Sequence, residues 1–145
     1  MKRGFTLLEL MVVIIILGII ATLGIQQYFR VVEKSRSSEA KMIMGQIRDV
    51  AAGYYIDHQT LAPFDSAAAG IGAGTYLIPE TCRNSHYFIY EVIASTPTGF
   101  TSLATRCLAG GKSPQGPVDG TVQLVTDFAS VAGDQDTWSY DPLYQ

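Results

Sequence analysis

The spacing of apolar residues changes twice along this chain of 145 residues. Residues 5–25 are apolar almost throughout, and Glu9 is the one ionisable side chain among them. As an α-helix this run would extend about 31 Å, which matches the ~30 Å thickness of a bilayer's hydrocarbon core. We therefore expect residues 5–25 to form a helix that crosses a membrane.

Residues 26–57 contain no proline and show the spacing of an amphipathic helix. Ile43, Ile47, Val50 and Tyr54 follow one another at intervals that place them on one helical face. We expect a single helix from Phe5 to about Ile56, whose second half packs on a domain. Mixed charges are expected on a solvated or intersubunit face of this helix, namely Arg30, Glu33, Lys34, Arg36 and Glu39.

Residues 58–85 are rich in Ala, Gly and Pro and predict a loop between helix and sheet. From His86 onward the apolar residues alternate with a period of two, which indicates strands. The first expected strand begins at His86 and is followed by a turn at residues 96–99. Two further strands are expected at residues 100–107 and 120–128. Short connections predict an antiparallel meander, so residues 86–145 would hold a sheet and an acidic C-terminal region. The fold class is α+β, a long N-terminal helix packed on a small antiparallel sheet.

Composition narrows the classes of function. Apolar residues make up 48% of the chain and charged residues 16%, against roughly 25% charged in an average soluble domain. With a net charge of −3, the chain is too apolar and too weakly charged to be disordered. Ten Lys and Arg against 13 Asp and Glu disfavour a specific nucleic-acid partner.

The first residues orient the apolar run. Lys2 and Arg3 should keep the N-terminus in the cytoplasm and place the chain from Gln26 onward outside. A conventional secretory signal is disfavoured because its apolar core is usually 7–15 residues long. A simple membrane anchor is disfavoured by Glu9, since a carboxylate in hydrocarbon costs roughly 2.5–3.5 kcal/mol.

The N-terminal residues resemble a known signature. Gly4-Phe5-Thr6-Leu7-Leu8-Glu9, followed by the apolar run, resembles the prepilin signature of type IV pilins and type II secretion pseudopilins. The resemblance implies that residues 1–4 are a leader, that a prepilin peptidase cuts after Gly4, and that the new amino group of Phe5 is methylated. It also implies that residues 5–25 are retained as the core of a filament.

Glu9 has an expected role in assembly. No Lys or Arg lies three or four residues away on the same helix, so the nearest available cation is the amino group of Phe5 after cleavage. In a filament this amine would come from a neighbouring subunit, and the pairing would fix the register between subunits. The alternative is that Glu9 is only an acidic residue at the positive end of the helix dipole.

Cys82 and Cys107 lie on the exported side by this topology, where cysteines are oxidised. We expect one disulfide between them; a metal pair or a free nucleophile has no supporting ligands nearby. Members of the resembled family commonly carry a disulfide in this half of the chain.

The region after Cys107 is acidic. Asp134, Asp136 and Asp141 are candidate ligands for Ca²⁺, an idea that the resemblance to pseudopilins raises, although the sequence is not that of an EF-hand. The alternative is a solvated acidic loop. No other cofactor is expected.

An enzyme is not predicted, because adjacent Ser85 and His86 have no third group placed with them. We expect a structural subunit of a type IV pilus-like filament. Its partners would be other copies of itself, the membrane, prepilin peptidase and the inner-membrane assembly machinery. It would wait in the inner membrane and end in an extracellular pilus. Alternatives are a secretion pseudopilin of a periplasmic pseudopilus, or a minor pilin acting in adhesion or DNA uptake.

Overall fold

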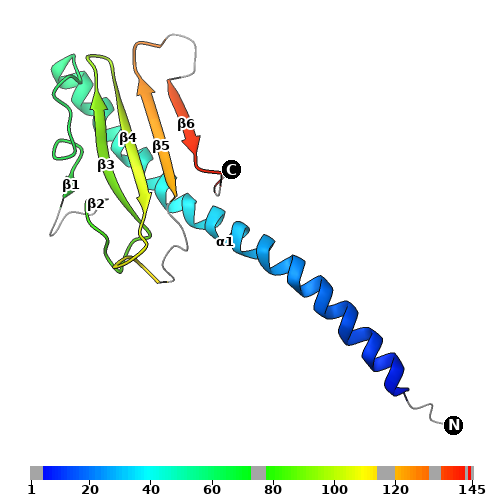
Figure 1. Cartoon of the computed structure of the whole chain (residues 1–145). Helices are drawn as coiled ribbons and strands as arrows, with labels where there is room; N and C mark the ends of the chain where they lie inside the picture. Colours follow the sequence, from blue (N-terminus) through cyan, green and yellow to red (C-terminus); the bar gives the residue numbers. More distant parts are fainter. Residues whose placement is uncertain (1–4, 73–77, 114–119, 131–134, 143, 145) are drawn as a thin grey trace. The chain divides into compact units, whose positions relative to one another are not determined.

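A computed structural model describes the chain except for residues 1–4, 73–77, 114–119, 131–134, 143 and 145 (Figure 1). The chain divides into two compact units, Met1–Val32 and Glu33–Gln145, which we describe separately. We call the second unit the head. One helix, α1 (Leu7–His58), contributes residues to both units.

The predicted long helix is confirmed, displaced by two residues at each end. It contains 52 residues, which corresponds to about 78 Å of helix. Proline is absent from the whole segment, so each residue beyond the first turn can donate its backbone N–H four residues back.

The head contains a four-stranded antiparallel sheet in the order β3-β4-β5-β6 (Figure 1). Its strands are β3 (Phe88–Ser95), β4 (Gly99–Arg106), β5 (Thr121–Asp127) and β6 (Asp136–Tyr140). The α+β fold and the three predicted strands are confirmed. β6 was not predicted, because its five residues alternate over a short stretch within a segment that we interpreted only by its acidity.

The segment predicted as a loop contains two short strands. β1 (Ile71–Gly72) and β2 (Ile78–Pro79) form a parallel pair of two residues each. Such short strands leave no periodic pattern that sequence analysis can detect. β2 also lies against β3, so this segment lines that edge of the sheet.

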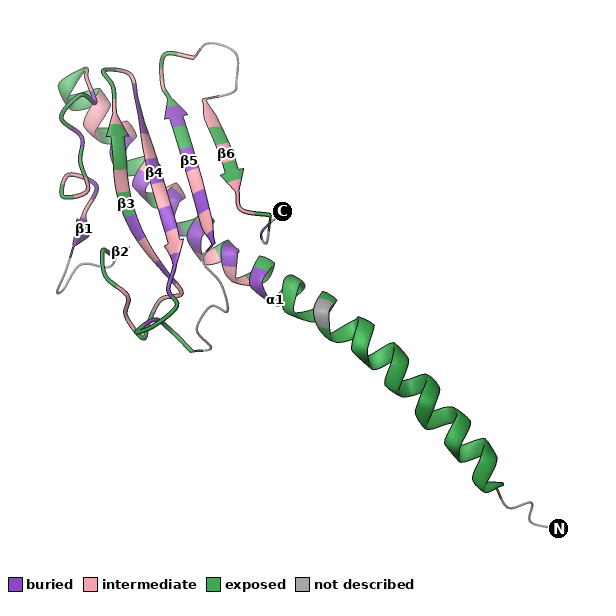
Figure 2. Ribbon diagram, in the orientation of Figure 1, coloured by how far each residue is buried: buried purple, intermediate pink, exposed green. Residues whose placement is uncertain are grey.

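The core of the head lies between α1 and the inner face of the sheet (Figure 2). On the helix, the buried apolar residues are Ala40, Ile43, Met44, Ile47 and Ala51. The predicted position of Val50 was wrong: Val50 is 44% exposed, whereas Ala51 is fully buried. The face of the helix that carries residues 40, 44, 47 and 51 is turned towards the sheet, and residue 50 lies at the edge of this face.

Candidate functional site

The beginning of α1 is set by a capping arrangement. The Thr6 hydroxyl Oγ1 accepts the backbone N–H of Glu9 at 3.2 Å, and the Thr6 carbonyl accepts the N–H of Leu10 at 3.3 Å. Thr and Glu three residues apart are typical of a helix N-terminus. Sequence analysis did not identify this motif. The motif explains why the helix begins at Leu7.

The apolar side chains of the first unit are exposed all around the helix. By length and composition α1 is able to cross a membrane, and none of its most apolar stretch is buried within the protein. The exposed large apolar residues begin with Phe5 and Leu7 and continue to Ile25. A helix that is apolar on every side must be covered by lipid or by other protein.

Glu9 lies within this apolar surface. In the part of the chain that the structure describes, its carboxylate has no cation within ion-pair distance. Phe5, the expected new N-terminus, is exposed. Gly4, the residue of the expected cleavage site, lies outside the described residues. Glu9 is therefore an exposed acid on an apolar helix, without an ion-pair partner among the described residues.

A buried ion network joins α1 to the sheet in the head. Arg106 Nε, on β4, lies 3.1 Å from Glu33 Oε2, and the two side chains are 0% and 8% exposed. Arg36 contacts the other carboxylate oxygen of Glu33. Arg106 also donates from Nη1 to the carbonyl oxygen of Tyr87 at 2.9 Å. The network thus links the helix, β4 and the residue that precedes β3.

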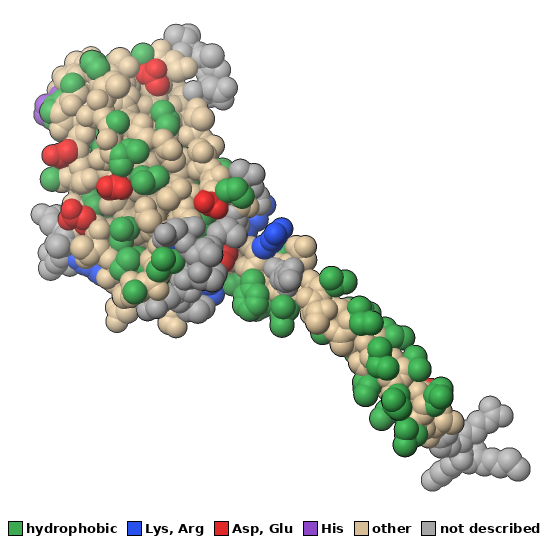
Figure 3. All heavy atoms as spheres, in the orientation of Figure 1, with side chains coloured by type: hydrophobic (Ala, Val, Ile, Leu, Met, Phe, Trp, Pro, Cys, Tyr) green, Lys and Arg blue, Asp and Glu red, His purple; other side chains and the backbone are tan. Residues whose placement is uncertain are grey.

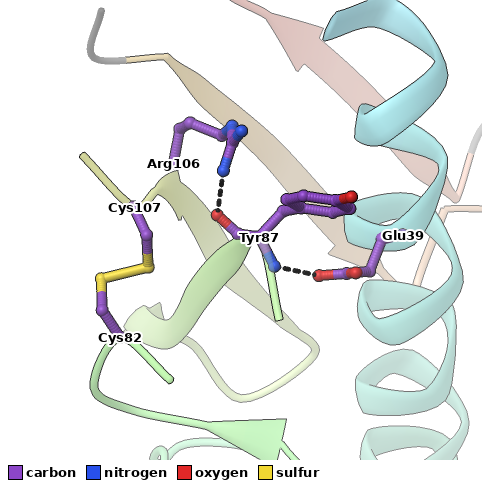
Figure 4. The surroundings of a disulfide bond; sticks show 5 residues. All are labelled: Glu39, Cys82, Tyr87, Arg106 and Cys107. Carbon is purple, nitrogen blue, oxygen red and sulfur yellow. Dashed lines mark hydrogen bonds between the residues drawn. A yellow bond between two sulfur atoms is a disulfide. The ribbon is translucent and has the colours of Figure 1, made fainter. Parts of the chain in front are cut away.

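Tyr87 is bound through its backbone N–H and carbonyl, as Figure 4 shows, and cations also lie near its ring. Its N–H donates to Glu39 Oε1 at 2.7 Å, so a second carboxylate of α1 binds this segment. Three cations lie near its ring: Lys112 Nζ at 4.8 Å, Arg106 Cζ at 4.9 Å and Arg36 Cζ at 5.3 Å from the centroid. Cations at such distances are attracted by the ring's electrons.

The predicted environment of Glu33 and Glu39 was wrong. We expected a solvated or intersubunit face, but both side chains bind groups on or beside the sheet. The sequence did contain a signal, because Arg106 occupies an inward-facing position of an alternating strand. A buried cation needs a carboxylate, and the helix that covers the sheet is the element able to supply one.

The expected disulfide between Cys82 and Cys107 is confirmed, with 5.8 Å between the Cα atoms (Figure 4). Cys107 directly follows β4 and is buried. A backbone hydrogen bond from Lys112 N to His86 O, 2.8 Å long, ties the same two segments together. Gly111 packs so closely on Cys107 that an added Cβ would overlap it.

The candidate calcium ligands are not gathered into a site that the structure describes. Asp136 Oδ2 lies 2.6 Å from Arg48 Nε, and Asp136 Oδ1 accepts a hydrogen bond from Thr126 Oγ1 at 2.9 Å. Asp134 lies outside the described residues. Among the described residues, no three His, Cys, Asp or Glu side chains cluster as metal ligands would. Asp136 is therefore occupied by contacts within the head.

Comparison with known proteins agrees with this architecture. Residues 1–25 match the prokaryotic N-terminal methylation motif. The chain is 42% identical to the fimbrial protein EcpC of Eikenella corrodens over 116 residues, which cover 79% of this chain and 70% of EcpC. It is 32% identical to the type IV major pilin PilE of Neisseria gonorrhoeae over 75 residues, 52% of this chain and 44% of PilE.

A shorter match links it to the type IV major fimbrial protein FimA of Dichelobacter nodosus, at 42% identity over 48 residues, 33% of this chain and 31% of FimA. No solved structure matches.

These relatives are structural proteins rather than enzymes. The exposed contact of 2.8 Å between Ser85 Oγ and His86 Nδ1 is accordingly a surface hydrogen bond and no part of a catalytic site. The methylation motif, the long helix with its exposed apolar start, and the similarity to EcpC lead to one conclusion. This chain belongs to the type IV pilin family and is a fimbrial subunit of a pilus filament.

Proposed function

We propose that this chain is inserted in the inner membrane as a precursor, trimmed by prepilin peptidase, and assembled into a pilus by packing of residues 5–25 against neighbouring copies. The observation that supports this is the uncovered apolar surface of residues 5–25, in which Glu9 is the one ionisable side chain. Residues 1–4 act as the leader, residues 26–57 as the amphipathic half of the helix, residues 58–85 as its connection to the sheet, and residues 86–145 as the sheet with its acidic region.

The same surface serves two environments in turn. Lipid tails cover the apolar helix in the membrane, and apolar side chains of neighbouring helices replace them in the filament. Because lipid is as apolar as leucine, transfer from one to the other costs little, and close packing and polar pairs decide the equilibrium. A single polar pair can therefore control assembly.

Glu9 and the amine of Phe5 form that pair in our proposal. Cleavage after Gly4 creates a positive amino group four residues from Glu9, in a segment that otherwise carries no cation. An ionised carboxylate alone in hydrocarbon costs roughly 2.5–3.5 kcal/mol on insertion scales. The amine of the neighbouring copy removes this cost and fixes the axial register of one helix against the next.

The topology follows from the flanking charges. Lys2 and Arg3 hold the N-terminus in the cytoplasm, and the head lies outside before and after assembly. The inner-membrane assembly machinery then draws the subunit into the fibre. The relatives EcpC and PilE are named as fimbrial and pilin proteins, which favours a pilus over a secretion pseudopilus.

Mass spectrometry of fibres sheared from cells tests the proposal. We expect the N-terminal peptide to begin with N-methylated Phe5. A chain that begins at Met1 or beyond Ile25, or fibres that lack this chain, would contradict it. Gly4→Val is the matched variant: it should leave an unprocessed precursor in the membrane and none in the fibre fraction.

A further inference from the structure

The head has two chemically different ends along the direction of α1. Glu33 meets Arg106, the last residue of β4, whereas Tyr55 stacks on Phe128, just after β5, with 5.6 Å between ring centroids. α1 therefore runs along the sheet from one end to the other. We call the end at Arg106 the base and the end at Phe128 the tip.

Cations gather at the base. Lys34 and Lys41 are exposed on the part of α1 near Glu33, and the Nζ of Lys41 lies 4.5 Å from the centroid of the Tyr140 ring. Lys112 is exposed beside Tyr87. The carboxylates of this end include Glu33 and Glu39, which are engaged within the head, together with Glu80 and Asp141.

Carboxylates gather at the tip. Asp57 is exposed in the last turn of α1, Asp65 is exposed in the segment that follows the helix, and Asp127 is the exposed last residue of β5. Asp65 and Asp127 each use Oδ1 to cap a backbone N–H, at 2.8 and 3.0 Å, and among the described residues neither carboxylate forms an ion pair. Arg48, the cation of α1 nearest this end, lies 2.6 Å from Asp136.

The cations of the surface reflect this division. On the face of the head shown in Figure 3, the coloured Lys and Arg atoms lie towards the base and none lies over the tip, whereas Asp and Glu atoms are spread from the tip to the base. Glu91, near the middle of β3, is an exposed carboxylate between the two ends. The tip thus presents exposed carboxylates, whereas the base presents exposed lysines together with Glu80 and Asp141.

We propose that the base of one head binds the tip of a second copy in the filament, through Lys34, Lys41 and Lys112 on one side and Asp57, Asp65 and Asp127 on the other. This inference rests on the proposed function, since it assigns a contact within the pilus. A helical filament is built by a heterologous interface, in which two different surfaces of the same chain meet. Exposed lysines at the base and carboxylates at the tip suit such a contact and disfavour base-to-base or tip-to-tip pairing.

These lysines and aspartates do not pair within one head. Lys34 and Asp57 belong to the same helix, and their separation along it corresponds to about 35 Å. A direct bond between them must therefore join two copies. This gives a test that needs no substitution.

The test is carbodiimide treatment of sheared wild-type fibres, which joins lysine and carboxylate side chains that are already in contact. Peptide mass spectrometry should find Lys34, Lys41 or Lys112 joined to Asp57, Asp65 or Asp127. Links between lysines and carboxylates that never include those three aspartates would overturn the inference. Absence of this chain from the fibres would instead contradict the proposed function.

Charge reversal provides a second measurement. Lys34→Glu with Lys112→Glu, or Asp57→Lys with Asp127→Lys, should each lower the subunit recovered in fibres at least about tenfold, because like charges then face one another. Combining all four substitutions should restore most of the yield. Glu91→Lys changes the charge by the same amount per residue away from both ends, and it should leave the yield within about twofold of wild type. Equal yields from all of these chains would overturn the inference.

Discussion

Glu33 Oε2 lies 3.1 Å from Arg106 Nε although the two residues are 73 positions apart in the chain. Both side chains are buried, so each charge depends on the other for the interactions that water would otherwise supply. The pair joins the first turn of α1 in the head to the last residue of β4. It thereby specifies how the helix lies on the sheet.

Arg106→Met should destabilise the head by about 3 kcal/mol, because it removes one of the two arginines that contact the buried Glu33 carboxylate within the described chain. Urea unfolding of the detergent-solubilised chain, followed by fluorescence of the single Trp138, measures this. Glu33→Leu combined with Arg106→Met should cost less than the two single changes added together. Strictly additive losses would show that the two side chains do not interact.

The cysteines should react with a thiol reagent only after reduction, because Cys82 and Cys107 are bonded to each other. Replacing both with Ser should destabilise the head by roughly 3 kcal/mol, since the unfolded chain loses a closed loop. Membrane insertion should stay unchanged, because it depends on residues 5–25. Full labelling of the native chain without reductant would exclude the bond.

The fold was largely predictable because the sequence contains two strong patterns of apolar residues. Twenty or so apolar residues in a row indicate a membrane helix, and alternation along Phe88, Tyr90 and Val92 indicates a strand that is buried on one face. β6 was missed because its alternation covers only Asp136–Tyr140, and β1 and β2 are too short to show any alternation.

The ion network was not predictable in the same way. Local charge patterning made Glu33 and Glu39 look like surface residues, and their partners Arg106 and Tyr87 lie 73 and 48 positions away. Such contacts depend on how the helix is rotated against the sheet. An error of one position, as with Val50 and Ala51, is enough to hide which side chains face inward.

The head should lose stability in alkali through Tyr144. Burial raises the pKa of Tyr144 from 10.0 to about 12; the Glu33 charge also raises it, while Arg106 lowers it and Asp141 raises it slightly. The folded state therefore keeps the phenol protonated while the unfolded chain ionises. The contribution of Tyr144 to the free energy of unfolding is fully present below pH 10. It is lost between pH 10 and about 12, at up to about 1.4 kcal/mol per pH unit.

Comparison with Tyr144→Phe isolates this effect, because burial also raises the pKa of Tyr90. Urea unfolding at several pH values between 9 and 12 should show a shallower decline for the variant than for the wild type. Parallel declines would mean that Tyr144 ionises alike in the folded and unfolded chain.

Two glycines of the head should respond oppositely to alanine. Nothing in the described chain lies within 4 Å of a Cβ added to Gly53 on α1, so Gly53→Ala should stabilise the solubilised subunit by about 1 kcal/mol. A Cβ on Gly120 would overlap the ring of Tyr144, so Gly120→Ala should destabilise it. Thermal unfolding of both variants, followed by circular dichroism, checks the signs. A loss of stability in Gly53→Ala would contradict the open surroundings of that position.

The central claim is that Glu9 acts in assembly through the amine of a neighbouring Phe5. Loss of one partner of a buried pair costs about 3–5 kcal/mol, and roughly 1.4 kcal/mol is already tenfold in an equilibrium. Removal of the carboxylate from hydrocarbon should, by contrast, slightly favour membrane insertion. Glu9→Ala removes the group, and Glu9→Gln keeps its shape while removing its charge.

The decisive measurement is the amount of subunit in the inner membrane and in sheared fibres for the wild type, Glu9→Gln and Glu9→Ala. We predict normal membrane levels for all three, together with at least tenfold less subunit in the fibres of both variants. Equal fibre yields from the three chains would contradict the pairing and would leave Glu9 as a residue that only begins a helix.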